Sequence, residues 1–348
     1  MFRKTTPPRC DRILAMRAFF AGLILAALLP AAKTLDVYFI DVEGGQATLI
    51  VSPSGQSMLV DTGWAGFNNR DANRIADAAK LAGVKQIDYL VITHYHADHV
   101  GGVTQLAAKL PVKHYVDHGP NRETGASPDA LFSAYQKSWS SGQRITVKPG
   151  DKIPVKGLDV QVLAADGKRI QTPLKGAGQP NALCGRDKPG PEDKSENARS
   201  TGTLITFGQF RLIDLGDLTW NKEQDLVCPN NLVGTVDVYL TTHHGADTSG
   251  PATIVHALKP RVAIMNNGAT KGGTPPAWQV LHNSPGIQDI WQLHYAVSAG
   301  KDNNVGEQFI ANLEQSDHQG KWIKLSAEEN GNFTVTNSRN NFSKTYKR

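Results

Sequence analysis

Short apolar runs separated by turns recur along most of this 348-residue chain. Runs of β-branched and aromatic residues bounded by Gly, Pro or Ser predict β-strands. The strands expected on this basis lie at 34–42, 46–52, 57–63, 87–94, 112–119, 201–208, 210–217, 236–245, 261–267, 289–294, 307–314 and 321–327. The segment at 87–94 is nearly all apolar, which predicts a strand buried on both faces.

Three segments predict helices instead. They lie at 73–83, which ends in glycine, at 127–139, which begins Ser-Pro-Asp, and at 250–260, which ends at proline. Strands alternating with helices predict two strand-rich halves covered by helices on their outer faces. The polar stretch at 166–200 is rich in Gly and Pro, and we expect a long loop there that is a candidate lid over a ligand.

Residues 1–32 have a pattern of charged and apolar residues unlike that of the rest of the chain. Five basic residues precede an apolar run of 15 residues at 18–32. A membrane-spanning helix needs about 20 apolar residues. The segment therefore predicts a signal peptide cleaved near Ala31 or Ala32, with an uncleaved membrane anchor as the alternative. We expect the mature protein to be periplasmic or secreted, with membrane contact only through the export signal.

Charge and composition limit the classes of partner. The net charge of +5 falls to +1 without residues 1–32, because this segment holds five basic residues and one acidic residue. The basic character thus belongs to the export signal, and we expect no strong nucleic-acid-binding surface. Hydrophobic residues make up 40% and charged residues 20%, which excludes a disordered chain.

The cysteines agree with export. Cys10 leaves with the signal, and Cys184 and Cys228 remain as an even pair. In an oxidising compartment such a pair predicts a disulfide, and two unrelated thiols are the alternative. Neither cysteine lies in a Cys/His cluster, which disfavours a thiolate metal site.

The segment "VITHYHADHVGG" carries the strongest chemical signal. His94, His96, Asp98 and His99 directly follow the predicted buried strand at 87–94. Imidazole and carboxylate groups together favour a divalent metal, zinc above all. A solvated histidine-rich loop is the alternative, but it does not explain four ligand-type residues within six positions after a buried strand.

Other ligand-type residues also stand at the ends of predicted strands. They are Asp61 in "DTG", Asp217 in "LGD", and His243 and His244 in "HHG". We expect one cavity at a shared strand edge to collect them. In a pair of adjacent histidines usually only one imidazole points at the metal, so one of these two is an expected ligand and the other a further candidate.

The run from Thr93 to His99 resembles the signature of the metallo-β-lactamase superfamily, and the resemblance covers nearly all of 35–300. It implies an α+β fold, a four-layer αββα sandwich, with residues 33–348 as the hydrolase domain. The segments "IDVEGGQATLI", "ENARSTGTLITF", "LIDLGD" and "TTHHGA" look more specifically like the exported hydrolase domain of ComEC-like competence proteins. One departure is Gln46, which stands where that family has an aspartate.

The resemblance also implies roles for the residues. His94 and His96 would hold a first zinc ion, Asp98, His99 and His243 a second one, and Asp217 both. One or two Zn²⁺ ions per chain are expected. Asp98 and Asp61 are the expected catalytic residues, with Asp61 orienting a ligand or the attacking water and Asp98 accepting a proton.

The family's third histidine for the first metal has no counterpart, because no histidine lies between His118 and His243. Asn197 stands at that place, and His118 is an alternative ligand. His294 is a further candidate, either as a substrate contact or as a buried, hydrogen-bonded residue.

The resulting functional hypothesis is an exported metal-dependent hydrolase that uses a metal-bound hydroxide. A small-molecule or polymeric phosphodiester is the favoured substrate, since two metal ions suit its cleavage. Hydrolysis of a β-lactam, a lactone or another ester is one alternative. A non-catalytic, metal-binding exported module is the other.

Overall fold

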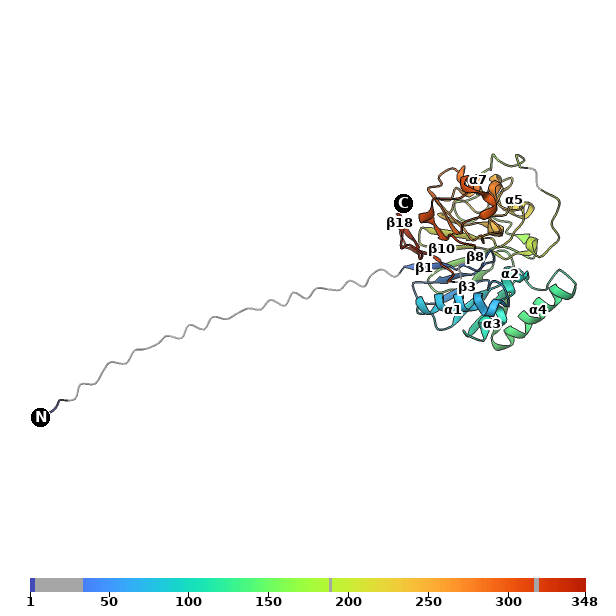
Figure 1. Ribbon diagram of the computed structural model, residues 1–348. Helices are drawn as coiled ribbons and strands as arrows, with labels where there is room; N and C mark the ends of the chain where they lie inside the picture. The colour runs from blue at the N-terminus through green and yellow to red at the C-terminus, as the bar shows by residue number, and fades with distance from the viewer. Residues whose placement is uncertain (4–33, 188–189, 316–318) are drawn as a thin grey trace. The chain divides into compact units, whose positions relative to one another are not determined.

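Two packed β-sheets form the centre of the structure (Figure 1). This computed structural model describes residues 1–3, 34–187, 190–315 and 319–348. The residues from 34 onward belong to one compact unit. Most of the predicted signal peptide lies outside the described residues. Among the helices of the described ranges, none is both long and apolar enough to span a membrane.

The first sheet comes from both ends of the chain. Within the described residues it has nine strands in the order β18-β17-β16-β1-β2-β3-β4-β5-β6. These are β1 (Leu35–Phe39), β2 (Thr48–Val51), β3 (Ser57–Val60), β4 (Ile87–Val91), β5 (Val112–Asp117), β6 (Gln143–Thr146), β16 (Ile323–Ala327), β17 (Phe333–Asn337) and β18 (Ser343–Tyr346). The strands from β3 to β6 run parallel, so their carboxyl ends lie along one edge.

The second sheet comes from the middle of the chain. In the described part it has the order β15-β14-β13-β12-β11-β10-β8-β7, and β9 pairs with β8. Its strands are β7 (Lys152–Ile153), β8 (Asp159–Ala165), β9 (Lys168–Arg169), β10 (Gly202–Phe207), β11 (Phe210–Asp214), β12 (Val238–Leu240), β13 (Val262–Met265), β14 (Asp289–His294) and β15 (Ile310–Asn312). The strands from β11 to β15 are parallel.

Helices cover the outer face of each sheet (Figure 1). The α-helices are α1 (Arg70–Leu81), α2 (Ala97–Val100), α3 (Val103–Ala107), α4 (Ala126–Ser138), α5 (Trp220–Val227), α6 (Ala252–Leu258) and α7 (Pro275–His282). Short 3-10 helices are η1 (Phe67–Asn69), η2 (Trp139–Ser141), η3 (Asn197–Arg199), η4 (Thr242–Gly245), η5 (Val297–Ala299), η6 (Lys301–Asn303) and η7 (Glu307–Phe309).

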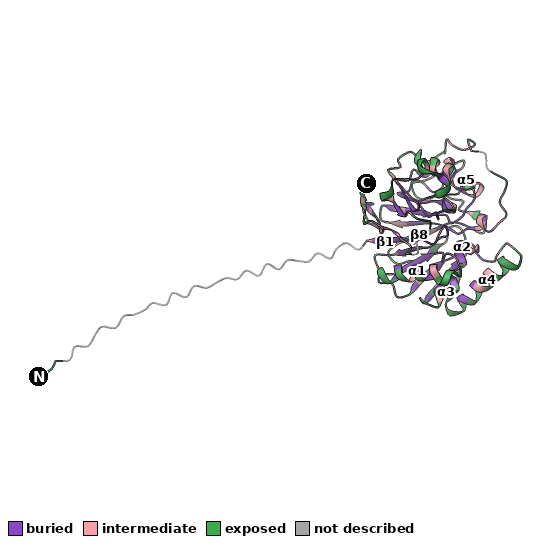
Figure 2. Ribbon diagram, viewed as in Figure 1, coloured by how far each residue is buried: buried purple, intermediate pink, exposed green. Residues whose placement is uncertain are grey.

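Three apolar cores define the layers. One lies between the sheets and contains Phe39, Val91 and Leu240. The second packs α1, α3 and α4 against the first sheet, and the third packs α5, α6 and α7 against the second sheet. Buried residues accordingly line the central layers, and exposed residues lie on the helices (Figure 2). The predicted α+β, four-layer sandwich is confirmed.

Helix α1 shows how the sequence pattern produces one of these layers. Ala72, Ile75 and Ala79 recur at helical spacing and are buried against the first sheet. Gly83 follows the helix with a φ of 72°, and its N–H bonds back to the carbonyl of Lys80. A glycine in the left-handed region is typical of a helix C-terminus, which explains where α1 ends.

Cys184 and Cys228 form a disulfide, as predicted. It links the long loop that follows β9 to the residue after α5, across a sequence separation of 44. The loop is therefore covalently attached to the second half of the sandwich.

Candidate metal centre

The histidine-rich loop begins directly after β4, whose residues are mostly buried. Asp98 and His99 lie in the short helix α2 and are themselves buried. A Cβ atom at Gly101 would lie 2.1 Å from the carbonyl oxygen of Ala97. Only glycine permits so close a backbone approach, so this residue allows the loop to turn tightly behind its ligand-type side chains.

The second sheet supplies the other ligand-type residues. Asp217 follows β11, and His243 and His244 follow the neighbouring parallel strand β12. Both histidines have positive φ values, 53° and 57°, which non-glycine residues adopt infrequently. Their ring centroids lie 6.0 Å apart at an interplanar angle of 65°, so this turn directs the two imidazoles differently.

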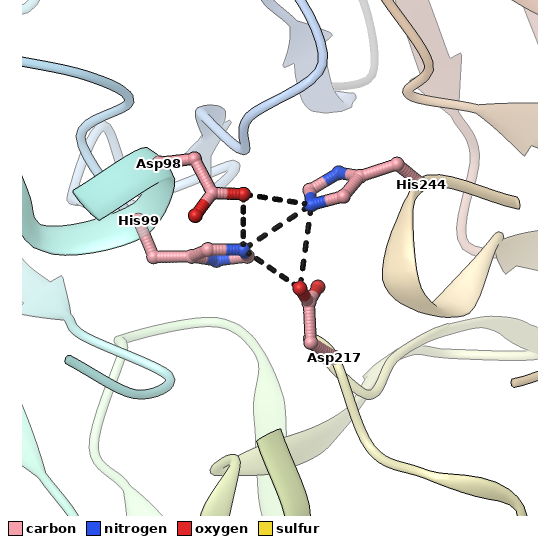
Figure 3. Close-up of side chains that lie close together, drawn as sticks. All are labelled: Asp98, His99, Asp217 and His244. Atoms are coloured by element: carbon pink, nitrogen blue, oxygen red, sulfur yellow. Dashed lines mark hydrogen bonds and ion pairs between the residues drawn. The ribbon is translucent and has the colours of Figure 1, made fainter. Parts of the chain in front are cut away.

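Four side chains converge on one point: Asp98, His99, Asp217 and His244 (Figure 3). The Nε2 atoms of His99 and His244 are 3.3 Å apart. Asp98 Oδ2 lies 3.3 Å from the first of these atoms and 3.2 Å from the second. Asp217 Oδ2 lies 3.1 Å and 3.4 Å from the same two atoms. All four residues are buried.

These distances fit a metal ion. Tetrahedral zinc with ligand bonds of about 2.0–2.1 Å has ligand atoms about 3.3–3.4 Å apart. The five distances in the cluster run from 3.1 to 3.4 Å. A second indication is that Asp217 Oδ1 and His94 Nε2 are buried without a hydrogen-bond partner. Buried polar atoms normally have partners, so these atoms have unused ligand capacity.

The charges of the cluster also favour a cation. Burial alone would raise the pKa of Asp217, but His244 and His99 hold it well below its usual range. Burial would likewise raise the pKa of Asp98, and His99, His244 and Lys271 lower it. Burial, together with the charge of His99, lowers the pKa of His94. The carboxylates are thus ionised and His94 is neutral, which are the forms that bind a metal. Burial alone would lower the pKa of His99, but Asp217, Asp98 and Asp61 raise it well above its usual range, so a metal bound there would displace a proton.

Asp61 lies behind His99, at the end of β3. Its Oδ2 atom is 2.7 Å from His99 Nδ1, and it also accepts hydrogen bonds from the backbone N–H and the hydroxyl of Thr93. When Nδ1 of His99 carries the hydrogen that is donated to Asp61, the Nε2 atom keeps a lone pair that can face the cluster.

Two further histidines, His243 and His94, lie near Asp217, and His96 lies beside His94. His243 Nε2 lies 3.5 Å from Asp217 Oδ2, and His94 Nε2 lies 3.9 Å from it. The ring centroids of His94 and His96 are 4.6 Å apart. His94 and His96 thus lie side by side, as the expected first-ion pair should, but neither belongs to the four-residue cluster. His244, named only as a further candidate, does belong to it. The ligand roles of His94, His96 and His243 stay predictions.

The remaining candidates lie around this centre in different ways. Asn197 is in η3, and its Oδ1 atom is buried without a partner. Ser200, just after it, has its hydroxyl 3.4 Å from His94 Nδ1. His118 Nε2 lies 2.9 Å from the carboxylate of Glu196. Neither Asn197 nor His118 therefore belongs to the four-residue cluster.

His294 is buried and belongs to a separate group with Asp41 and Glu43. Its Nε2 atom lies 2.6 Å from Asp41 Oδ1. The guanidinium of Arg74 lies 2.7 Å from Asp41 and 3.1 Å from Glu43. Because a permanent cation already pairs with both carboxylates, we interpret this group as a buried ion-pair network. It joins the loop after β1 to β14 in the other sheet.

Two residues at the centre, Glu123 and Lys271, were not predicted from the sequence pattern. Glu123 Oε1 lies 3.2 Å from His96 Nε2 and accepts a hydrogen bond from the backbone N–H of Glu196. Lys271 pairs with Asp98. These partners lie 27 to 173 residues away along the chain, so no local spacing indicates them.

A cavity of about 420 Å³ adjoins the centre. Its lining includes residues 190–193 of the long loop, together with Trp220 and Thr248. The hydroxyl of Thr248 lies 2.9 Å from His243 Nδ1. The end of the loop at 166–200 therefore lines a space beside the candidate site, and its role as a lid stays a prediction.

Comparisons with known proteins agree with this geometry. Residues 40–177 match the model of the metallo-beta-lactamase superfamily. "Recombination protein 2" of Haemophilus influenzae is 25% identical over 312 residues, covering 88% of this chain and 33% of that protein. "Competence protein ComA" of Neisseria gonorrhoeae is 22% identical over 229 residues, covering 65% and 26%. A "UPF0173 metal-dependent hydrolase" of Aeropyrum pernix is 25% identical over 229 residues, covering 63% and 78%.

The four-layer fold, the histidine motif after β4 and the His/Asp cluster thus define a metal-dependent hydrolase. Over residues 40–177 the chain resembles the metallo-beta-lactamase superfamily, and over a longer stretch it resembles the ComEC-like competence proteins. It spans a third or less of the length of the first two relatives.

Proposed function

We propose that this protein is an exported, zinc-dependent phosphodiesterase with two metal positions that share Asp217. One observation carries the proposal: Asp217 Oδ2 has the Nε2 atoms of four histidines around it. These atoms belong to His99 at 3.1 Å, His244 at 3.4 Å, His243 at 3.5 Å and His94 at 3.9 Å. With four imidazole nitrogens within 3.9 Å, this carboxylate would help to hold two ions, His99 and His244 contributing to one position and His94 and His243 lying near the other.

Zinc is the proposed metal because the donors are imidazoles and carboxylates at distances near tetrahedral values. When bound, the ions supply Lewis acidity and make a nucleophile available at neutral pH. The chain's own residues do the rest. Asp61 fixes the ring of His99, and Glu123 lies where it can fix the ring of His96.

A phosphodiester is the proposed substrate for two reasons. A pair of divalent ions can hold both the attacking and the leaving oxygen of a phosphoryl group. The relatives named for recombination and competence also favour a substrate related to nucleic acid. Export is supported by the disulfide, because disulfides persist mainly in oxidising compartments.

The test uses the full mature chain, stripped of metal and reloaded with zinc. We expect hydrolysis of bis-p-nitrophenyl phosphate that is lost with a chelator and restored by zinc. Elemental analysis of the same sample should give up to two zinc ions per chain. In the variant Asp98→Ala, turnover should be lost while the far-UV circular dichroism stays unchanged, because Asp98 lies at the cluster and outside the apolar cores.

Other substrates decide between this proposal and its alternatives. Faster turnover of a β-lactam or a lactone than of the diester would make the protein a hydrolase of those esters or amides. Bound zinc without turnover of any of the three would indicate a non-catalytic metal-binding module.

A further inference from the structure

Lys271 places a positive charge at the rim of the candidate metal centre. It lies in the segment between β13 and α7, and its ammonium contacts the carboxylate of Asp98. The ammonium also donates to the carbonyl of Gly44 at 2.7 Å and lies 5.2 Å from the ring centroid of Trp64. The side chain is 37% exposed, so the charge is accessible from solvent.

Close packing between two loops fixes this position. The backbone N–H of Gly268 bonds to the carbonyl of Lys271 at 2.8 Å. A Cβ atom at Gly44 would lie 2.9 Å from Lys271 Cβ, and one at Gly268 would lie 2.7 Å from the backbone of Glu43. The two loops are packed closely at Gly44 and Gly268, so the backbone and Cβ atom of Lys271 have a fixed position. Its flexible end remains able to reach a ligand at the centre.

The positive charge of Lys271 indicates which kind of ligand this centre favours. Among the described residues, no other lysine or arginine forms an ion pair with Asp98 or Asp217. A divalent cation held by these carboxylates repels an ammonium beside it, so the lysine opposes metal binding unless an anion is also present. A phosphodiester carries such an anionic oxygen, and it would be attracted by the ions and the ammonium together.

We propose that Lys271 is the anion-binding residue that selects phosphodiesters over uncharged esters at this centre. The inference rests on the proposed phosphodiesterase function for its substrate. One part of the inference, the binding of a phosphate oxyanion by Lys271, can be tested without measuring substrate turnover.

The main variant is Lys271→Gln, which keeps a polar side chain and removes the charge. Lys271→Arg keeps the charge. The matched control is Lys324→Gln, because Lys324 pairs with Asp36 at 2.8 Å and lies 5.2 Å from the ring of Tyr38, on β16 and β1. The control variant therefore removes the charge of a lysine that is also paired with an aspartate near an aromatic ring, but that lies on a strand of the first sheet.

The first measurement is calorimetric titration of each zinc-loaded protein with inorganic phosphate. We expect Lys271→Gln to weaken phosphate binding at least tenfold, and Lys271→Arg to recover most of the affinity. Lys324→Gln should bind phosphate like the wild type. Equal phosphate affinity in Lys271→Gln and the wild type would overturn the inference, whatever substrate the enzyme hydrolyses.

The second measurement is the ratio of kcat/KM for bis-p-nitrophenyl phosphate to that for the uncharged p-nitrophenyl acetate. We expect Lys271→Gln to lower this ratio at least tenfold, mainly through KM for the diester, with zinc content unchanged. An equal loss on both substrates, or a loss of zinc, would mean that Lys271 only positions Asp98, and the inference would be wrong. If the wild type cleaves no diester but binds phosphate through Lys271, the proposed function fails while the anion site stands.

Discussion

Asp61 and His99 are joined by a 2.7 Å contact between a carboxylate oxygen and an imidazole nitrogen, although 38 residues separate them in sequence. Asp61 has a φ of 60°. The backbone N–H of Thr93 donates to its Oδ1 atom, and the hydroxyl of Thr93 donates to Oδ2, the oxygen that contacts His99. His99 thus has its ring orientation set before it meets any ion. Outer partners of this kind commonly tune metal affinity.

Replacing Asp61 by Asn should weaken zinc binding about 10–100-fold, the usual effect of losing such a partner. Asparagine tolerates the positive φ, but its amide group offers one acceptor oxygen in place of two. Competition with a chromophoric chelator measures the affinity, and circular dichroism checks the fold. Unchanged zinc affinity in a folded Asp61→Asn protein would show that the contact does not support the site.

The two adjacent histidines should differ in their effect on metal binding. His244 is buried with its Nε2 within 3.2–3.4 Å of three cluster atoms, whereas 21% of the His243 side chain is exposed. We expect His244→Asn to remove the more tightly held zinc ion and His243→Asn to retain it. Asparagine is chosen because both positions have positive φ. Zinc titration of the two variants gives the order, and the reverse order would restore His243 as the main ligand.

Glu223 should make the protein less stable as the pH rises. Its carboxyl group is buried in α5 and accepts the backbone N–H of Gly250. Burial raises its pKa from 4.5 to about 8. The native state therefore keeps a proton that the unfolded state releases, so the stabilisation is complete below pH 4.5 and is lost as the pH rises towards 8.

Glu223→Gln removes this dependence. Between pH 6 and 8 the free energy of unfolding of the wild type should fall relative to the variant by up to about 1.4 kcal/mol per pH unit. Urea denaturation of both proteins at pH 6, 7 and 8 gives the difference, in which contributions shared by the two proteins cancel. Parallel pH profiles would mean that Glu223 is ionised in the native state.

Removing the disulfide should lower the free energy of unfolding and leave zinc binding unchanged. Closing a loop of this length stabilises a chain by up to about 4 kcal/mol in the chain-entropy model. The double variant Cys184→Ser/Cys228→Ser should therefore unfold at lower urea concentration. Its zinc content at 25 °C should match the wild type, because neither cysteine contacts the four-residue cluster. Loss of zinc in the folded variant would instead link the long loop to the site.

The sequence predicts the centre best where its chemistry is local. His94 to His99 follow a buried strand at a contiguous spacing, and Asp217 stands at the end of another strand. The choice between His243 and His244 depends on two left-handed backbone conformations, which no pattern of residue types reveals. Glu123 and Lys271 reach the centre through tertiary packing alone.

The fold follows a similar division. Apolar runs predict many of the strands and three of the helices. The elements outside the predicted segments are α2, α3, α5, α7, β6, β7, β8, β9, β17 and β18. Gln46 stands where the ComEC-like family has an aspartate, and the structure explains this difference. Its side-chain N–H donates to the buried carboxylate of Asp214 at 2.8 Å, and burial raises the pKa of Asp214 to about 6. An aspartate at position 46 would bring two buried carboxylates together, which is unfavourable.

The four clustered ligands come in equal shares from the two sheets, Asp98 and His99 from one and Asp217 and His244 from the other. Neither sheet alone therefore positions more than half of this donor set. The complete set exists only when the two sheets are packed together, so an ion held by all four residues would report their assembly.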